Sequence, residues 1–353
     1  MSDSLQAGAP SSPGPAGAAP GPKGPTAPRC PSCGAGVPLA ERFCEACGAP
    51  LTPTADVVTG SPSRPGRAGA VEPVGRVADA GAPALSPRDH YVEQPASWVA
   101  ACCDKGIRHQ RNEDATAVAA EELPGSRAVL VVCDGVSTST DSDVAALAGA
   151  RAARDVLAGS RPSGPGAGAG RPVALAQAFA AATAQANAAV VANTAVDSEN
   201  AASCTFAAAV VEGDLVAFAN VGDSRVYWLP DAGEPAELSL DDSVAQVRMA
   251  MGVAREEAEN GPQAHAITKW LGRDSPDTTP RTGTLELTTP GWVLVCSDGL
   301  WNYASAAPVL QALVTRLAAE AGGRPLALAQ ALVSWANARG GRDNISAALA
   351  RHR

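Results

Sequence analysis

Short hydrophobic runs recur along the chain from residue 97 onward, and several of them end beside an aspartate. Three such runs and their aspartates are 292–296 with Asp298, 128–133 with Asp134, and 215–221 with Asp223. Short apolar runs rich in β-branched residues and bounded by turn residues predict buried strands. A fourth aspartate, Asp343, lies just before the apolar run 345–350. The pattern therefore predicts buried strands that carry carboxylates at their ends.

Longer amphipathic stretches predict helices between these strands. They begin near Ser142 and at Pro172, and two more cover residues 307–321 and 326–339. A hairpin signal at 212–214 joins two strands, and residues 224–229 are expected to continue them as a third antiparallel strand. Antiparallel strands with helices inserted in pairs predict an α+β fold with two packed sheets and helices outside.

Composition distinguishes the region that is predicted to fold from two other segments of the chain. The chain has 353 residues with 35 Gly and 29 Pro, and these concentrate in residues 1–29 and 51–95. Those segments carry too few large apolar side chains to offset the entropy of ordering, so both are predicted to be disordered. Residues 96–353 are long enough for one large domain.

Charge and hydropathy limit the partners and the cellular location that are expected for this chain. The net charge of -9 argues against nucleic-acid binding, which needs a basic surface. The most apolar long segment, 173–196, is interrupted by polar residues and is expected to be a packed helix rather than a membrane span. No targeting signal is evident at the N-terminus, so the prediction is a cytoplasmic protein with no membrane partner.

Four of the nine cysteines form two C-x-x-C pairs in residues 30–50, each followed by glycine. They are Cys30, Cys33, Cys44 and Cys47. This spacing lets four thiolates converge on one ion and predicts a zinc ribbon with one structural Zn²⁺. Two disulfides are the disfavoured alternative in a chain without a signal peptide. The ribbon could also bind a protein partner.

The carboxylates at the strand ends predict a second kind of metal centre. A further acidic pair, Glu113 and Asp114, lies in a loop that also contains basic residues. Carboxylates gathered together repel one another unless cations lie between them, and oxygen ligands suit Mg²⁺ or Mn²⁺.

Seven short motifs occur in one order along residues 97–353. They are 111–115 (Arg-Asn-Glu-Asp-Ala), 133–137 (Cys-Asp-Gly-Val-Ser), 203–205 (Ser-Cys-Thr), 219–225 (Ala-Asn-Val-Gly-Asp-Ser-Arg), 267–272 (Ile-Thr-Lys-Trp-Leu-Gly), 297–299 (Ser-Asp-Gly) and 343–345 (Asp-Asn-Ile). Together they resemble the type 2C metal-dependent serine/threonine protein phosphatases, in particular bacterial ones. The resemblance implies a four-layer α-β-β-α sandwich of two antiparallel sheets, here preceded by the zinc ribbon and the linker. It also implies a signalling enzyme that hydrolyses phosphoserine and phosphothreonine in protein substrates by direct attack of a metal-bridged water.

The resemblance also assigns roles by position. Asp134 would bridge two Mn²⁺ or Mg²⁺ ions, the Gly135 carbonyl would bind one of them, and Asp298 and Asp343 would bind the other. The pair Glu113 and Asp114 would hold metal-bound waters, and Asp223 with Asp298 would form a third, weaker site.

Two positions depart from the family pattern. The family's histidine or methionine after Asp-Gly is Val136 here, which leaves the proton donor to the leaving group unassigned. The family's phosphate-binding arginine falls on His109. Because His109 and Arg111 would share one face of an extended stretch, His109 is predicted to contact the substrate phosphate, with Arg111 as the second candidate.

Two other functions compete with this one. Cys102 and Arg108 satisfy the C-x5-R spacing of cysteine-dependent phosphatases, although Asp104 within that loop would repel a phosphate. A catalytically silent phosphatase-like binding module, presented by the zinc ribbon, is the other alternative. The intact set of metal-position carboxylates argues against it.

Overall fold

The computed structural model describes residue 29 and residues 86–161 and 167–353. The four cysteines predicted to bind zinc, Cys30, Cys33, Cys44 and Cys47, lie outside the described residues, as does most of the two segments predicted to be disordered. The chain divides into two units, Met1–Ala70 and Val71–Arg353. All the described strands and helices belong to the second unit.

Two antiparallel sheets form the centre of this second unit. The first sheet has the strand order β1-β2-β13-β12-β8-β9, and the second has the order β11-β7-β6-β4-β3. The strands of the first sheet are β1 (His90–Ala96), β2 (Val99–Asp104), β13 (Ile345–His352), β12 (Gly291–Cys296), β8 (Arg225–Pro230) and β9 (Ala236–Glu237). Those of the second are β11 (Arg281–Glu286), β7 (Leu215–Val221), β6 (Phe206–Glu212), β4 (Ala128–Cys133) and β3 (Ala115–Ala120). A small separate ladder pairs β5 (Ser203–Cys204) with β10 (Leu271–Gly272).

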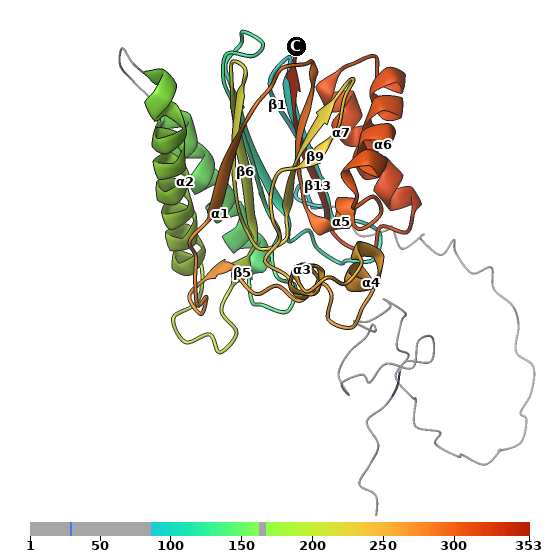
Figure 1. Cartoon of the computed structure of the whole chain (residues 1–353). Helices are drawn as coiled ribbons and strands as arrows, with labels where there is room; N and C mark the ends of the chain where they lie inside the picture. The colour runs from blue at the N-terminus through green and yellow to red at the C-terminus, as the bar shows by residue number, and fades with distance from the viewer. Residues whose placement is uncertain (1–28, 30–85, 162–166) are drawn as a thin grey trace, which may run out of the picture. The chain divides into compact units, whose positions relative to one another are not determined.

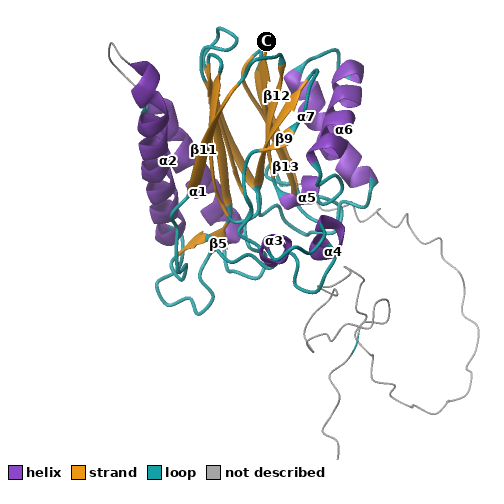
Figure 2. Ribbon diagram, viewed as in Figure 1, coloured by secondary structure: helices purple, strands orange, loops and turns teal. Residues whose placement is uncertain are grey.

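Helices cover the outer face of each sheet, as Figures 1 and 2 show. The helices α1 (Ser142–Gly159) and α2 (Ala167–Ala192) pack on the second sheet, and α6 (Ala307–Glu320) and α7 (Pro325–Ala338) pack on the first. Three short helices lie in the connections: α3 (Val244–Ala250), α4 (Arg255–Glu259) and α5 (Asp298–Trp301). The predicted α-β-β-α sandwich is confirmed.

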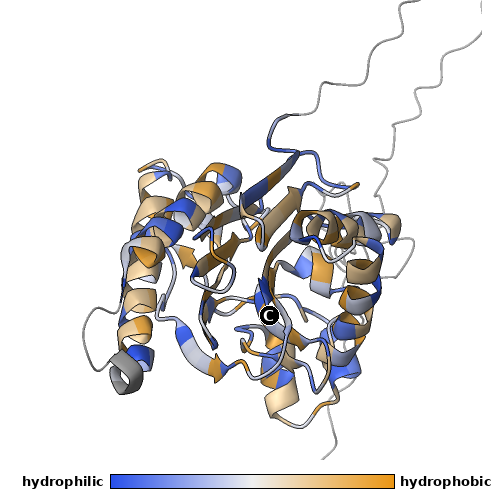
Figure 3. Cartoon of the chain, turned by 90° about the horizontal axis from the view of Figure 1, so that it is seen from above, coloured by the Kyte–Doolittle hydropathy of each residue, from blue (hydrophilic) through white to orange (hydrophobic). Residues whose placement is uncertain are grey.

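The hydrophobic core forms three layers because side chains alternate along each strand. In β4, Val129 and Val131 pack with α1 and α2, whereas Leu130 and Val132 pack against the first sheet. A third cluster fills the space between the first sheet and α6 and α7. Seen along the layers, the strands carry mostly hydrophobic residues and the helices carry both kinds (Figure 3). Burying each such Val or Leu contributes roughly 1.5–3 kcal/mol, so the strand ends are held on a stable frame.

Helix α2 contains the segment Gly170–Ala192, the one stretch among the described residues that is long and apolar enough to cross a membrane by length and composition alone. Its Leu175, Phe179 and Val190 are almost fully buried in the core against the second sheet. These three residues belong to the face of α2 that packs on the second sheet.

Three details differ from the sequence prediction. Residues 90–95 of the predicted disordered linker 51–95 belong to the edge strand β1 (His90–Ala96), whose side chains are largely exposed and therefore give no hydrophobic pattern. Helix α2 begins before Pro172, which lies inside it. Strand β8 does not extend the β6–β7 hairpin but pairs with β12 in the other sheet. The chain therefore crosses between the sheets at 222–224, directly at Asp223.

Candidate metal centre

In the first sheet, strand pairing gathers three aspartates at one edge. Cys296 at the end of β12 pairs with Ala347 near the start of β13 and with Arg225 at the start of β8. Asp298 and Asp223 each lie two residues from these positions, and Asp343 lies four residues before Ala347. The antiparallel register thus places their backbones at the same edge.

The second sheet contributes two acidic residues in the same way. Ala115 at the start of β3 pairs with Cys133 at the end of β4, so Asp114 and Asp134 are neighbours across the ladder. The backbone of Asp134 exchanges hydrogen bonds with Thr205: its N–H donates to Thr205 Oγ1 at 3.0 Å, and its carbonyl accepts from the Thr205 N–H at 2.8 Å. Thr205 Oγ1 also lies 2.7 Å from Ser224 Oγ, beside Asp223. Asp134 is therefore tied to the point where the chain crosses between the sheets.

Two glycines next to the aspartates allow close backbone contacts. A Cβ on Gly135 would lie 2.6 Å from the Glu113 carbonyl oxygen, and one on Gly299 would lie 1.9 Å from the Asn344 carbonyl oxygen. Both distances are shorter than real Cβ contacts. Glycine at these positions lets the segments that carry the carboxylates approach one another.

The acidic pair in the loop before β3 is buried and held by neighbouring side chains. Glu113 Oε1 accepts hydrogen bonds from Arg111 Nη2 at 2.7 Å and from Ser142 Oγ at 2.6 Å. Asp114 Oδ2 accepts from Ser297 Oγ at 2.7 Å. Ser297 precedes Asp298, so this bond joins the loop of the second sheet to the end of β12.

Burial and repulsion between carboxylates raise the pKa values of four of the aspartates. Burial raises the pKa of Asp114 to about 6 and that of Asp223 to about 7. The pKa values of Asp134 and Asp298 are raised well above the ordinary range, first by burial and then by repulsion from the other aspartates, Asp343 included. Each shift means that the ionised form of the aspartate is less stable in this site than in water.

A divalent cation fits this donor set. The oxygens Asp114 Oδ1 and Asp298 Oδ1 are buried and accept no hydrogen bond, which is costly for a carboxylate unless a cation or a cation-bound water contacts it. All the donors are oxygen, as Mg²⁺ and Mn²⁺ prefer. Within residues 86–161 and 167–353, no three acidic, histidine or cysteine side chains form a ready-made cluster for an ion. The proposed ligand residues therefore lie at one edge of the sheets, but their side chains do not converge on one point.

The two candidate phosphate contacts also lie at this edge. His109 Nε2 is 3.3 Å from Asp343 Oδ1, and His109 Nδ1 is 4.0 Å from Glu113 Oε2. The guanidinium of Arg111, about half exposed, binds Glu113 and lies 4.0 Å from Asp143 Oδ1. Both side chains border the carboxylates, as their predicted role requires. Their contact with a phosphate remains a prediction.

A buried charged network supports the Asp223 side of the centre. Trp301 Nε1, in α5, donates to the Asp223 carbonyl at 2.9 Å. The Arg225 guanidinium lies 3.5 Å from the centre of the Trp301 ring, and its Nη2 donates to Asp241 Oδ2 at 2.7 Å and to Glu259 Oε1 at 3.1 Å. Asp223 thus lies in a turn whose backbone is held by Trp301, and Trp301 in turn packs against this charged network.

The cysteine-dependent alternative does not fit the structure. Cys102 and Cys103 are fully buried in β2, and burial raises the pKa of each thiol to about 12, so neither is a reactive thiolate. The remaining described cysteines, Cys133, Cys204 and Cys296, are also buried and form no disulfide.

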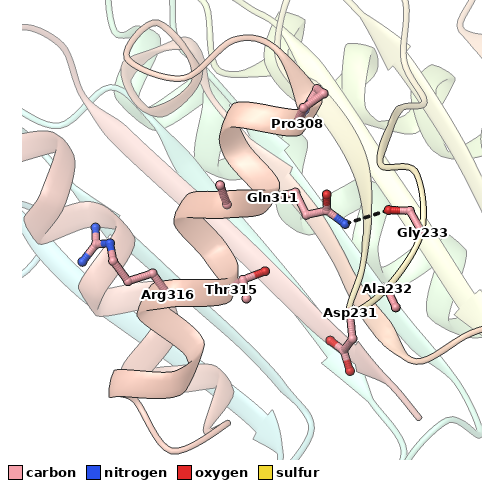
Figure 4. Close-up of a pocket in the computed structure, with 8 residues that line it drawn as sticks. Asp231, Ala232, Gly233, Pro308, Gln311, Thr315 and Arg316 are labelled. Atoms are coloured by element: carbon pink, nitrogen blue, oxygen red, sulfur yellow. Dashed lines mark hydrogen bonds between the residues drawn. The ribbon is translucent and has the colours of Figure 1, made fainter.

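A surface pocket lies away from the carboxylates. It is lined by Asp231 and Gly233 after β8 and by Gln311, Thr315 and Arg316 of α6 (Figure 4). Asp231 follows the end of β8 opposite to Asp223, so this hollow lies at the other end of the strand.

Comparison with known proteins agrees with this fold. The family model for protein phosphatase 2C matches residues 106–336, and a zinc-ribbon domain matches residues 29–51. Because the first match covers well over half of the chain, the chain belongs to the protein phosphatase 2C family and carries a zinc-ribbon domain in its N-terminal region.

Similar proteins include bacterial serine/threonine phosphatases. The protein phosphatase PhpP of Streptococcus pneumoniae is 32% identical over 143 residues, 40% of this chain and 54% of the relative. The serine/threonine protein phosphatase PstP of Mycobacterium tuberculosis is 28% identical over 253 residues, 71% of this chain and 44% of the relative. The chain thus spans about half the length of the curated relatives it matches.

Solved structures of similar fold cover nearly three quarters of the chain. The serine/threonine phosphatase of Streptococcus agalactiae has a TM-score of 0.56 and 25% identity, and the match covers 73% of this chain and 98% of that one. The catalytic domain of PstP in complex with two manganese ions has a TM-score of 0.51 and 24% identity, and covers 72% and 96%. The latter likeness concerns the fold alone.

Sequence reasoning missed several supporting residues. The Asn344 side chain accepts from the Glu113 N–H at 2.8 Å and donates to the carbonyl of Arg111 at 3.1 Å. Its place directly after Asp343 in a family-like motif could have signalled this role. Ser297 and Arg88 also contact Asp114, and Arg88 lies in a stretch with no recognisable pattern.

Proposed function

We propose that residues 96–353 form a metal-dependent protein phosphatase that hydrolyses phosphoserine and phosphothreonine in protein substrates. The observation that carries the proposal is the meeting of buried carboxylates from both sheets at one edge, with Asp114 Oδ1 and Asp298 Oδ1 left without a hydrogen-bond donor. The family and its serine/threonine-specific relatives support the reaction and the substrate class.

The residues divide into inner and outer ligands. Asp134, the Gly135 carbonyl, Asp298 and Asp343 would hold two Mn²⁺ or Mg²⁺ ions, and Glu113 and Asp114 would hold their outer coordination sphere. Asp223, with Asp298, would complete a third, weaker position. Two divalent cations bound by these residues would neutralise the phosphate charge and lower the pKa of a water for direct attack, so hydrolysis would need no enzyme nucleophile.

The chain's own side chains would bind and orient the substrate. His109, beside Asp343, would contact the phosphate at the rim, and Arg111 is the second candidate. Ser142 and Ser297 hold the carboxylates of Glu113 and Asp114 in place through the hydrogen bonds described above. Such outer partners fix the orientation of the ligands.

The N-terminal region would add a structural Zn²⁺ held by Cys30, Cys33, Cys44 and Cys47. This module would help its own fold and could bind a protein partner, without a role in hydrolysis. We place the whole protein in the cytoplasm, with phosphoproteins as substrates and no nucleic acid or membrane as partner.

Hydrolysis of phosphothreonine and phosphotyrosine peptides with Mn²⁺, with and without EDTA, tests the proposal. Asp134→Asn and Asp298→Asn each remove a charge that holds the ions, and the hydrolysis rate should fall by orders of magnitude. Full activity in EDTA, or wild-type turnover in both variants, would reject the metal-dependent reaction. An inactive wild-type chain that still binds phosphopeptides would favour the silent binding module instead.

A further inference from the structure

Arg88 contacts the backbone of the loop that carries Glu113 and Asp114. Its Nη2 donates to the carbonyl of Asp114 at 3.0 Å and to that of Asn112 at 3.3 Å. The Asn112 side chain returns a hydrogen bond from Nδ2 to the Arg88 carbonyl at 2.9 Å. Arg88 lies just before β1 and eighteen residues before the segment that the phosphatase family model matches.

The Arg88 bonds complement those that the same loop makes with Asn344, the residue before β13. On the β13 side, the Asn344 side chain binds the Glu113 N–H and the Arg111 carbonyl. The Arg88 bonds therefore fix two carbonyls that Asn344 leaves open. Asn112 and Asp114 are themselves almost fully buried, so a lost hydrogen bond to either carbonyl is costly.

Tyr91, in β1, supports the contact between Arg88 and the loop 112–114. The Tyr91 hydroxyl accepts a hydrogen bond from the Thr116 N–H at 2.8 Å, just after the loop. The Arg88 guanidinium carbon lies 6.0 Å from the centre of the Tyr91 ring, within reach of a cation–π contact. The segment before β2 thus lies along the whole turn from Asn112 to Thr116.

We infer that Arg88 is a positioning residue for the metal centre: its two hydrogen bonds fix the backbone of 112–114, and thereby the carboxylates of Glu113 and Asp114. The inference rests on the proposed function. It means that the stretch immediately before β1 is part of the working site, and that a change imposed on this stretch would alter metal binding.

The test measures binding of Mn²⁺ alone to the full chain, first saturated with zinc, by isothermal titration calorimetry. The variants are Arg88→Ala and Arg88→Lys, the second of which keeps the charge but replaces the guanidinium, whose Nη2 donates both bonds, with a compact ammonium on a different stem. Loss of an outer-shell partner typically weakens metal affinity by roughly 10–100-fold, and we expect a loss in this range for both variants.

Arg127 offers a matched control. Its Nη2 also donates to two backbone carbonyls, those of Leu157 at 2.8 Å and Ser160 at 2.6 Å, at the far end of α1. Arg127→Ala and Arg127→Lys should leave the Mn²⁺ affinity unchanged even if the melting temperature falls. If an Ala variant does not fold, Arg88→Lys and Arg127→Lys can still be compared.

The outcomes separate the inference from the proposed function. Wild-type Mn²⁺ affinity in both Arg88 variants overturns the inference, and so does an equal loss in the Arg88 and Arg127 variants, because that would be general destabilisation. A wild-type chain that binds Mn²⁺ but hydrolyses no phosphopeptide defeats the proposed function alone.

Discussion

The close contact at Gly299 predicts the effect of adding one methyl group. In Gly299→Ala the new Cβ would lie 1.9 Å from the Asn344 carbonyl oxygen, whereas carbon–oxygen contacts normally begin near 3.3 Å. The two segments must therefore separate by roughly 1.4 Å. One carries Asp298 and the other carries Asp343, so the substitution moves two proposed metal ligands apart.

A displacement of this size should be visible in catalysis. A misplacement of about 1 Å can cost ~100-fold in rate, which corresponds to ~2.7 kcal/mol in the activation free energy. We expect a loss of this order in kcat/KM for a phosphothreonine peptide at saturating Mn²⁺, together with weaker Mn²⁺ binding.

Gly159→Ala is the matched control, because a Cβ there meets no atom within 4 Å. It should leave kcat/KM unchanged. Near wild-type turnover in a folded Gly299→Ala variant would refute the reasoning, because it would show that the distance between the two segments does not set the activity.

Three further changes test other parts of the molecule. His109→Ala should raise KM with little change in kcat at saturating Mn²⁺, and a raised KM in Arg111→Ala with none in His109→Ala would reverse the assignment. Hydrogen bonds from Arg351 lower the pKa of Asp231, so the stabilisation from this half-exposed pair, below about 1 kcal/mol, is present at neutral pH and lost as the pH falls through the folded-state pKa. In urea unfolding, the deficit of Asp231→Asn should shrink below about pH 4, and a constant deficit would contradict this. Elemental analysis should find one zinc per chain, which Cys30→Ser should remove without loss of peptide hydrolysis; a fall in hydrolysis would give the ribbon a catalytic part.

The sequence predicted the strands that carry Asp134 and Asp298 because a buried strand and its closing turn leave a local pattern. It did not predict that β8 belongs to the other sheet, because the residues of the turn 222–224 are compatible with pairing of the next strand to either β7 or β12. It also missed β1, because an exposed edge strand needs few apolar residues. The contact between Arg88 and Asp114 spans 26 residues and depends on the pairing of β1 with β2, which no local pattern encodes.

The candidate centre draws Asp114 and Asp134 from one sheet and Asp298 and Asp343 from the other, so neither half of the sandwich holds a complete set. A cation bound there would link the two sheets, and it would stabilise the folded state over any state in which the sheets separate. A ligand that binds only the folded state adds ~2.7 kcal/mol to the unfolding free energy at about 100 times its Kd. Metal starvation in the cell would then shorten the lifetime of the folded chain and lower its abundance, in addition to stopping turnover.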